Sequence, residues 1–186
     1  DDFDDQKLPM YMVFWGTPAK DCWKIEDSCL KLKCIRQRLD DDLEQMKMDG
    51  ILADDKYVAF VSRRQCAMDA VITAAVKFYP EGQESAGIAA VQAMNHQIHI
   101  ERACEDGKQV VRVVVITADY IQPPYFPGFT STTNREIICS EAYDKSEIIL
   151  QLDMQHEDFC IRYGESEEEL KELCRIDGAV INPEKV

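Results

Sequence analysis

The chain has 186 residues, of which 46% are hydrophobic and 30% are charged, and its formal net charge is −14. These values are typical of a globular protein and exclude a disordered chain. The acidity argues against a nucleic-acid partner, because phosphate backbones require a basic surface, and it disfavours an anionic membrane surface. No apolar run approaches the roughly 20 residues that span a bilayer, which argues against membrane insertion. The length predicts one domain over residues 1–186, with a short acidic arm at residues 1–8.

Eight cysteines are spread over most of the chain, and no two of them form a CxxC pair. An even number without zinc or redox spacing predicts four disulfides formed in an oxidising compartment. The first residue is Asp1, which fits a secreted protein whose signal peptide has been removed, although a trimmed chain would begin in the same way. The alternative is a reduced intracellular protein with buried thiols. We therefore predict an extracellular protein in which these residues are paired: Cys22, Cys29, Cys34, Cys66, Cys104, Cys139, Cys160 and Cys174.

A short strand and a long helix are predicted for the first part of the chain. Residues 10–15 (MYMVFW) form an apolar run of strand length. Thr17-Pro18 is a helix start signal, and Gly50 is a helix stop. Apolar residues recur between them at spacings of three and four, which predicts an amphipathic helix over residues 17–50. This helix is either continuous or broken near Asp27-Ser28.

Three more helices are predicted further along the chain. Residues 64–79 and 84–95 are rich in alanine, and their apolar residues recur at helical spacing. Pro80 to Gly82 separates the two segments, and Gly87 weakens the second helix. A shorter helix is predicted within residues 166–175, because Ser166 and the three glutamates after it form a capping box.

The centre of the predicted sheet is the segment KQVVRVVVITADY, residues 108–120. From Val110 to Ile116 its residues are β-branched except for Arg112, and such a run is typical of a strand buried on both faces. Asp106-Gly107 predicts a hairpin to a strand that begins near Ile98. Other strands are predicted at 57–62, 136–140, 147–153 and 159–163. The predicted fold is α+β, with a mixed or antiparallel sheet covered by the long N-terminal helix and the Ala-rich helices and tied by disulfides.

The segment 122–135 (QPPYFPGFTSTTNR) is predicted to be the functional loop. Three prolines and a glycine exclude a helix or a central strand. Tyr125, Phe126 and Phe129 are candidate partner-binding residues, because exposed aromatic side chains on a stiff loop lose little entropy on binding. The alternative is that these three side chains fold back and cover the core.

No motif in the sequence identifies a reaction, a metal or a cofactor. His96 and His99 form HxxH beside Glu101, but zinc needs three or four converging ligands. The acidic run that begins at Asp40 lacks the glycine and the glutamate of a calcium loop. GxSxG, HExxH and Gly-rich phosphate loops are absent from the sequence. We predict no catalytic residue, no metal and no cofactor, and whether the protein is an enzyme stays open, with a non-enzyme favoured.

These observations favour a secreted, non-catalytic protein that binds an extracellular protein partner with a basic surface. The negative charge would steer such a partner toward the chain. Two alternatives stay open. One is a carrier of a small apolar or amine ligand in an internal cavity, and the other is a secreted hydrolase, whose active site is defined by geometry rather than by sequence spacing.

Overall fold

The structure is a computed structural model that describes residues 3–4, 7–18, 21–41, 57–121 and 130–181. The chain divides into two compact units, Asp1–Cys66 and Ala67–Val186. Strands dominate both units, and the described residues contain no α-helix. The prediction of an α+β fold is therefore wrong.

The first unit contains two small antiparallel sheets of two strands each. β1 (Met12–Gly16) pairs with β4 (Tyr57–Arg63), and β2 (Trp23–Glu26) pairs with β3 (Cys29–Leu32). The predicted strands at 10–15 and 57–62 are confirmed in these elements, with shifted ends. The predicted helix over 17–50 is wrong, because β2 and β3 lie inside it, and its remaining part from residue 42 onward lies outside the described residues. Asp27 and Ser28 adopt φ of 55° and 53° and form the turn of this hairpin, where a helix break had been considered.

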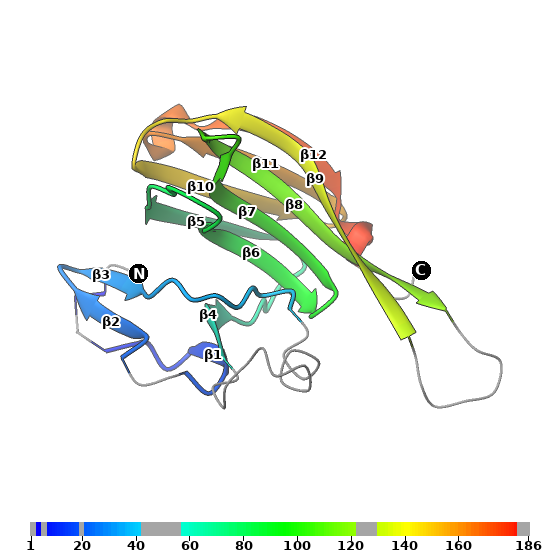
Figure 1. The fold of residues 1–186 in the computed structure, drawn as a ribbon, viewed down its shortest axis with the longest axis horizontal. Helices are drawn as coiled ribbons and strands as arrows, with labels where there is room; N and C mark the ends of the chain where they lie inside the picture. The colour runs from blue at the N-terminus through cyan, green and yellow to red at the C-terminus, as the bar shows by residue number, and fades with distance from the viewer. Residues whose placement is uncertain (1–2, 5–6, 19–20, 42–56, 122–129, 182–186) are drawn as a thin grey trace. The chain divides into compact units, whose positions relative to one another are not determined.

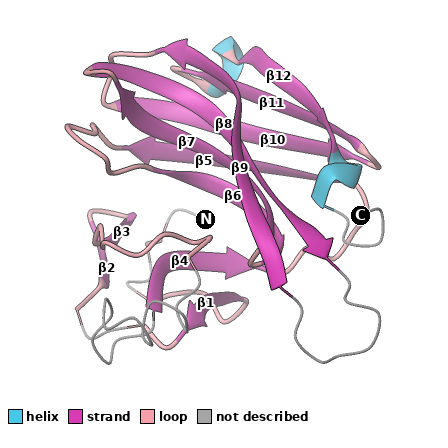
Figure 2. Cartoon of the chain, turned by 45° about the vertical axis from the view of Figure 1, so that its right-hand side comes forward, coloured by secondary structure: helices cyan, strands magenta, loops and turns pink. Residues whose placement is uncertain are grey.

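The second unit consists of two antiparallel sheets of four strands. The order of the first sheet is β6-β7-β8-β9, and the order of the second is β12-β11-β10-β5 (Figures 1 and 2). The strands of the first sheet are β6 (Ala86–Ala93), β7 (His96–Glu105), β8 (Lys108–Ile121) and β9 (Thr130–Ala142). Those of the second are β5 (Ala70–Lys77), β10 (Glu147–Gln155), β11 (Asp158–Gly164) and β12 (Lys171–Asp177). Two short 3₁₀ turns, η1 (Glu167–Glu169) and η2 (Gly178–Ile181), flank β12.

The two sheets pack face to face over one hydrophobic core. Alternate residues point inward because successive side chains of a strand lie on opposite faces. The burial pattern of β10 shows this alternation, with Ile148, Leu150, Leu152 and Met154 inside. The core residues of both sheets are Ile98, Ile100, Val111, Val113, Val115, Ile148, Leu150, Leu152, Met154, Phe159, Ile161 and Tyr163.

The prediction of a buried valine strand is confirmed in β8. Val111, Val113 and Val114 are fully buried, and β8 has a hydrogen-bonded neighbour on each side. The predicted Asp106-Gly107 hairpin is also confirmed, since Glu105 pairs with Lys108. Asp106 and Gly107 have φ of 49° and 76°, and a tight turn with positive φ at both central residues suits the twist of the flanking strands.

The predicted Ala-rich helices are strands, and the prediction is therefore wrong for both. Residues 64–79 contain β5, in which Ala70, Ile72, Ala74 and Val76 pair with the inward residues of β10. The segment thus carries a spacing of two as well as a helical spacing, and pairing with β10 decides between them. Residues 84–95 contain β6, where a Cβ at Gly87 would collide with the Ile100 carbonyl oxygen of β7.

The predicted C-terminal helix is wrong as well. Only Glu167–Glu169 forms a short 3₁₀ turn, and the Ser166 side chain makes no capping hydrogen bond. β12 follows directly and pairs with β11 as an edge strand of the second sheet. Cys174 therefore lies on a strand and contacts the core from the edge of that sheet.

Candidate functional site

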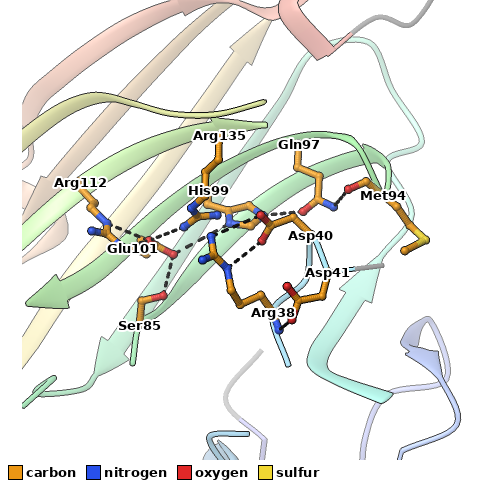
Figure 3. A network of polar contacts seen from close by, with 10 residues as sticks. All are labelled: Arg38, Asp40, Asp41, Ser85, Met94, Gln97, His99, Glu101, Arg112 and Arg135. Carbon is orange, nitrogen blue, oxygen red and sulfur yellow. Dashed lines mark hydrogen bonds and ion pairs between the residues drawn. The ribbon is translucent and has the colours of Figure 1, made fainter. Parts of the chain in front are cut away.

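A polar network on the outer face of the first sheet joins charged side chains from three of its strands (Figure 3). It follows from the alternation of β7, where Ile98 and Ile100 point into the core. Gln97, His99 and Glu101 therefore lie on the opposite face. The hairpin register places Arg112 of β8 directly beside Glu101 of β7.

Glu101 is the centre of this network. One of its carboxylate oxygens, Oε1, accepts from Nη2 of Arg112 at 2.7 Å and from Nη2 of Arg135 at 3.2 Å. The other oxygen, Oε2, accepts from the Ser85 hydroxyl at 2.8 Å. The Glu101 side chain is only 8% exposed, so the two guanidinium groups compensate a carboxylate that is largely removed from water.

Arg112 extends the network to a second carboxylate. Its Nη1 donates to Glu105 at 3.0 Å, and the Ser140 hydroxyl donates to the other oxygen of Glu105 at 2.9 Å. Burial alone would lower the pKa of Arg112, but the hydrogen bonds to Glu105 and Glu101 outweigh it and raise that pKa. The guanidinium is thus firmly charged, and it bridges the carboxylates of Glu101 and Glu105.

The two histidines of the HxxH motif do not converge. Residues three apart on a strand point to opposite faces, and the contacts of the two rings differ accordingly. His96 Nδ1 lies 3.0 Å from Asn95 Oδ1, whereas His99 Nε2 lies 2.6 Å from Gln97 Oε1. Burial lowers the pKa of His96. Within the part of the chain that the structure describes, no three His, Cys, Asp or Glu side chains could hold a metal ion together.

A second polar cluster lies where the edges of the two sheets meet. The Tyr163 hydroxyl donates to Glu141, and Lys171 Nζ contacts the same carboxylate at 3.0 Å. Lys171 also lies 4.5 Å from the centre of the Tyr163 ring. A surface hollow of about 300 Å³ is lined here by Tyr143, Tyr163 and Lys171, among others. The hydrogen bonds from Tyr163 and Lys171 lower the pKa of Glu141, which therefore stays ionised.

The predicted partner-binding residues Tyr125, Phe126 and Phe129 lie outside the described residues. The predicted loop is too long, because its last residues, from Thr130 onward, belong to β9. Sequence reasoning missed the network around Glu101. The signal was present, because Arg112 is the charge inside the valine run and the predicted hairpin pairs it with Glu101.

All eight cysteines are free thiols, so the prediction of four disulfides is wrong. Four of them lie in the first unit and four in the second. The core of the second unit is closed by apolar packing, and this explains why crosslinks are not required to hold the sheets together. The prediction of secretion depended on those disulfides and loses their support. No helix among the described residues has the length and apolar character to cross a membrane.

Two stacked antiparallel sheets with a shared core and polar outer faces define a β-sandwich domain of the concanavalin A-like class. The chain belongs to the family of beta xylosidase C-terminal concanavalin A-like domains (GH43_C2), whose profile matches residues 1–186. No curated protein matches the chain in sequence.

Several solved structures share this fold. The GH43 BlXynB protein from Bacillus licheniformis is 16% identical with a TM-score of 0.72, and its K247S mutant gives the same values. The xyloglucan PUL GH43B protein from Bacteroides ovatus is 18% identical with a TM-score of 0.68. Each comparison covers 97% of this chain but only 31% of the other chain. At these identities the likeness establishes the fold, and the chain spans about a third of the length of these proteins.

The prediction of a non-catalytic protein that binds an extracellular partner is therefore wrong. The family and the structural neighbours are those of glycoside hydrolase 43 proteins, which are carbohydrate-active. Of the three functions that the sequence left open, the hydrolase is the class to which these named proteins belong.

Proposed function

We propose that the chain is one domain of a glycoside hydrolase that acts on xylose-containing carbohydrate. We further propose that the groups that cleave the glycosidic bond lie outside residues 1–186. The family match along the whole chain carries this proposal, because the family is described by its position in beta xylosidases. The structural neighbours are three times longer than the region they share with this chain, which leaves room for a catalytic domain elsewhere.

The chemistry of the described carboxyl groups supports the second part of the proposal. Most glycosidases use a pair of carboxyl groups, one of which is a general acid whose pKa is raised so that it keeps its proton. Among the described residues, each carboxyl group with a displaced pKa is displaced downward. These groups are Glu26, Glu84, Glu141, Glu147, Asp153 and Glu172.

The Glu101 network fits a structural role in such an enzyme better than a catalytic one. A catalytic carboxylate needs an oxygen directed at the substrate, whereas both oxygens of Glu101 already accept hydrogen bonds. Arg112 and Arg135 both contact Oε1 of this carboxylate, so that oxygen is already engaged by two side chains of the domain itself. We expect the network to hold β7, β8 and β9 in register.

Hydrolysis of 4-nitrophenyl β-D-xyloside by the full-length protein that contains this chain tests the proposal, with the β-D-glucoside as a specificity control. We expect turnover of the xyloside, and we expect Glu101→Gln and Glu141→Gln to change kcat/KM less than about threefold below their melting temperatures. Loss of a general acid or base costs about 10²–10⁴-fold. A folded variant with such a loss would place a catalytic group in this domain, and failure of the full-length protein to cleave any xyloside would refute the substrate class.

A further inference from the structure

Two cysteines face each other across the junction of the two sheets. Cys139 lies on β9 and Cys174 on β12, and these are the edge strands of the first and second sheets. The two thiols are hydrogen-bonded to each other, with 2.9 Å between the two sulfur atoms. Thirty-five positions separate them in the sequence, so the contact belongs to the tertiary fold.

The backbone of both edge strands is irregular at this point. The pairing of β9 with β8 shifts between Val113 and Val114, immediately before Cys139, and leaves Ile138 as an extra residue. The pairing of β12 with β11 shifts between Ile161 and Arg162, next to Cys174. A bulge of this kind re-aims the side chains beside it. The two bulges coincide with the positions where the sulfur atoms approach each other.

The two thiols differ in acidity. The hydrogen bond with Cys174 lowers the pKa of Cys139, against a smaller effect of burial, and a backbone hydrogen bond at Val113 adds to the lowering. The hydrogen bond to Cys139 and burial raise the pKa of Cys174 strongly. These directions favour Cys139 as the thiol that ionises first, with Cys174 keeping its proton. Both side chains contact the core but are only partly buried, so a small oxidant can reach them.

We propose that Cys139 and Cys174 are a peroxide-sensitive thiol pair, in which Cys139 is oxidised first and Cys174 resolves it. The Cys139 thiolate attacks one oxygen of a hydroperoxide, the O–O bond breaks, and Cys139 becomes a sulfenic acid while the other oxygen leaves as hydroxide or alkoxide. The Cys174 sulfur then attacks the Cys139 sulfur, an S–S bond forms, the S–O bond breaks, and the hydroxyl leaves with the Cys174 proton as water. Two thiols lose two electrons, and the peroxide gains them.

The disulfide between Cys139 and Cys174 would form only when an oxidant is added. It therefore differs from the four structural disulfides that the sequence predicted, because the protein is folded with all its cysteines reduced. The bond would join the two sheets at the edges formed by β9 and β12. It would also close a loop of about 35 residues in the unfolded chain, which raises stability by reducing the entropy of unfolding.

The test uses the full-length protein treated with hydrogen peroxide, followed by alkylation and peptide mass spectrometry. We expect two alkylatable thiols to disappear, a linked peptide that contains Cys139 and Cys174, and full reversal by dithiothreitol. The melting temperature should rise by roughly 5–10 °C on oxidation. Cys174→Ser should leave a sulfenic acid on Cys139 that dimedone traps, and Cys139→Ser should abolish both the link and the trapped product.

Cys104→Ser is the matched control, since Cys104 is a partly exposed thiol on β7 in the same unit. We expect this variant to form the same link with the same rise in melting temperature. Folding of each variant is checked by circular dichroism before oxidation. A folded protein that loses thiols without the 139–174 link, or that links either residue to Cys160, would overturn the proposal, and so would a dimedone label on another cysteine in Cys174→Ser.

Discussion

The two sheets of the sandwich are built alike on the inside and differently on the outside. Their inner faces both consist mainly of apolar side chains, such as Ile100 on β7 and Leu150 on β10, each fully buried. The outer face of the first sheet carries the Glu101–Arg112 pair, whose side chains are 8% and 16% exposed. The second sheet carries Lys77–Glu147, whose side chains are 79% and 70% exposed.

This difference shows that the contribution of an ion pair to stability depends on its burial as well as on the two residues that form it. The distance between charged atoms is 2.7 Å in both pairs, so geometry does not separate them. Water screens the exposed pair and solvates either partner if the other is removed. A largely buried carboxylate leaves its guanidinium partners uncompensated when it is lost. We therefore expect the two ion pairs to respond very differently to the same substitution.

The largest expected effect concerns the shared inner faces. Ile100→Ala and Leu150→Ala should each lower the free energy of unfolding by about 2–5 kcal/mol, because each leaves a cavity in the common core. Urea denaturation of both variants measures this loss. Val71→Ala, at a side chain of β5 that is 55% exposed, is the control and should change it by less than about 0.5 kcal/mol. A large loss in only one of the two core variants would mean that the sheets are not equal partners.

The next largest effect is expected when the buried ion pair and the exposed ion pair each lose their carboxylate. Glu101→Gln should lower the free energy of unfolding by about 2–4 kcal/mol, since two guanidinium groups lose a largely buried carboxylate, while Arg112 keeps its contact with Glu105. Glu147→Gln removes the same charge from the exposed pair with Lys77 and should leave the denaturation midpoint unchanged. Equal midpoints for the two variants would contradict the proposed importance of burial.

A smaller effect is expected at the hairpin between β7 and β8. Gly107→Ala should cost about 1 kcal/mol, because a side chain is disfavoured at its φ of 76°. No other atom lies within 4 Å of the position of the new Cβ, so the loss would report backbone strain without a steric clash. Gly82→Ala, where the flexible Glu84 side chain is the neighbour, is the control. Thermal unfolding of both variants measures the difference, and equal melting temperatures would contradict strain at Gly107.

The smallest effect depends on pH and concerns the contact between the sheets at Glu141. Hydrogen bonds from Tyr163 and Lys171 lower the pKa of Glu141 from 4.5 in the folded state. A lowered folded-state pKa gives a contribution to stability that is present above pH 4.5 and is lost as the pH falls through the folded-state pKa. Melting temperatures of wild type and Glu141→Gln should thus differ slightly at pH 7 and converge as the pH falls below 4.5. A difference that grows on acidification would contradict this sign.

The helices were mispredicted where two periodicities coexist in the sequence. The segment from Ala70 to Lys77 has apolar residues at spacings of two, three and four, because alanine, valine and isoleucine occupy most of it. Local pattern cannot separate a strand from a helix in such a run. In the predicted helix over residues 84–95, Gly87 was the clearer sign of a strand. A glycine does not favour a helix, whereas the close approach of Ile100 on β7 requires a residue without a Cβ at this position.

The candidate site was only partly predictable. The Asp106-Gly107 turn sets the register of β7 and β8, and this register alone pairs Glu101 with Arg112. Arg135 could not be assigned to the network, because it comes from β9 and the bulge near Cys139 shifts the register of that strand. The contact of Cys139 with Cys174 was equally hidden, since it depends on how two separate sheets meet at their edges.

By itself, the sequence determined the buried valine strand and the hairpin that precedes it. Both depend on interactions between near neighbours, namely β-branched side chains and a turn with positive φ. The tertiary structure decided that the Ala-rich segments are strands, that the thiols are free and that Glu101 lies between two arginines. The pairing of β5 with β10 and the contact of Glu101 with Arg135 join segments distant in the chain, and there the hydrogen bonds and desolvation of a packed sheet outweigh local preferences.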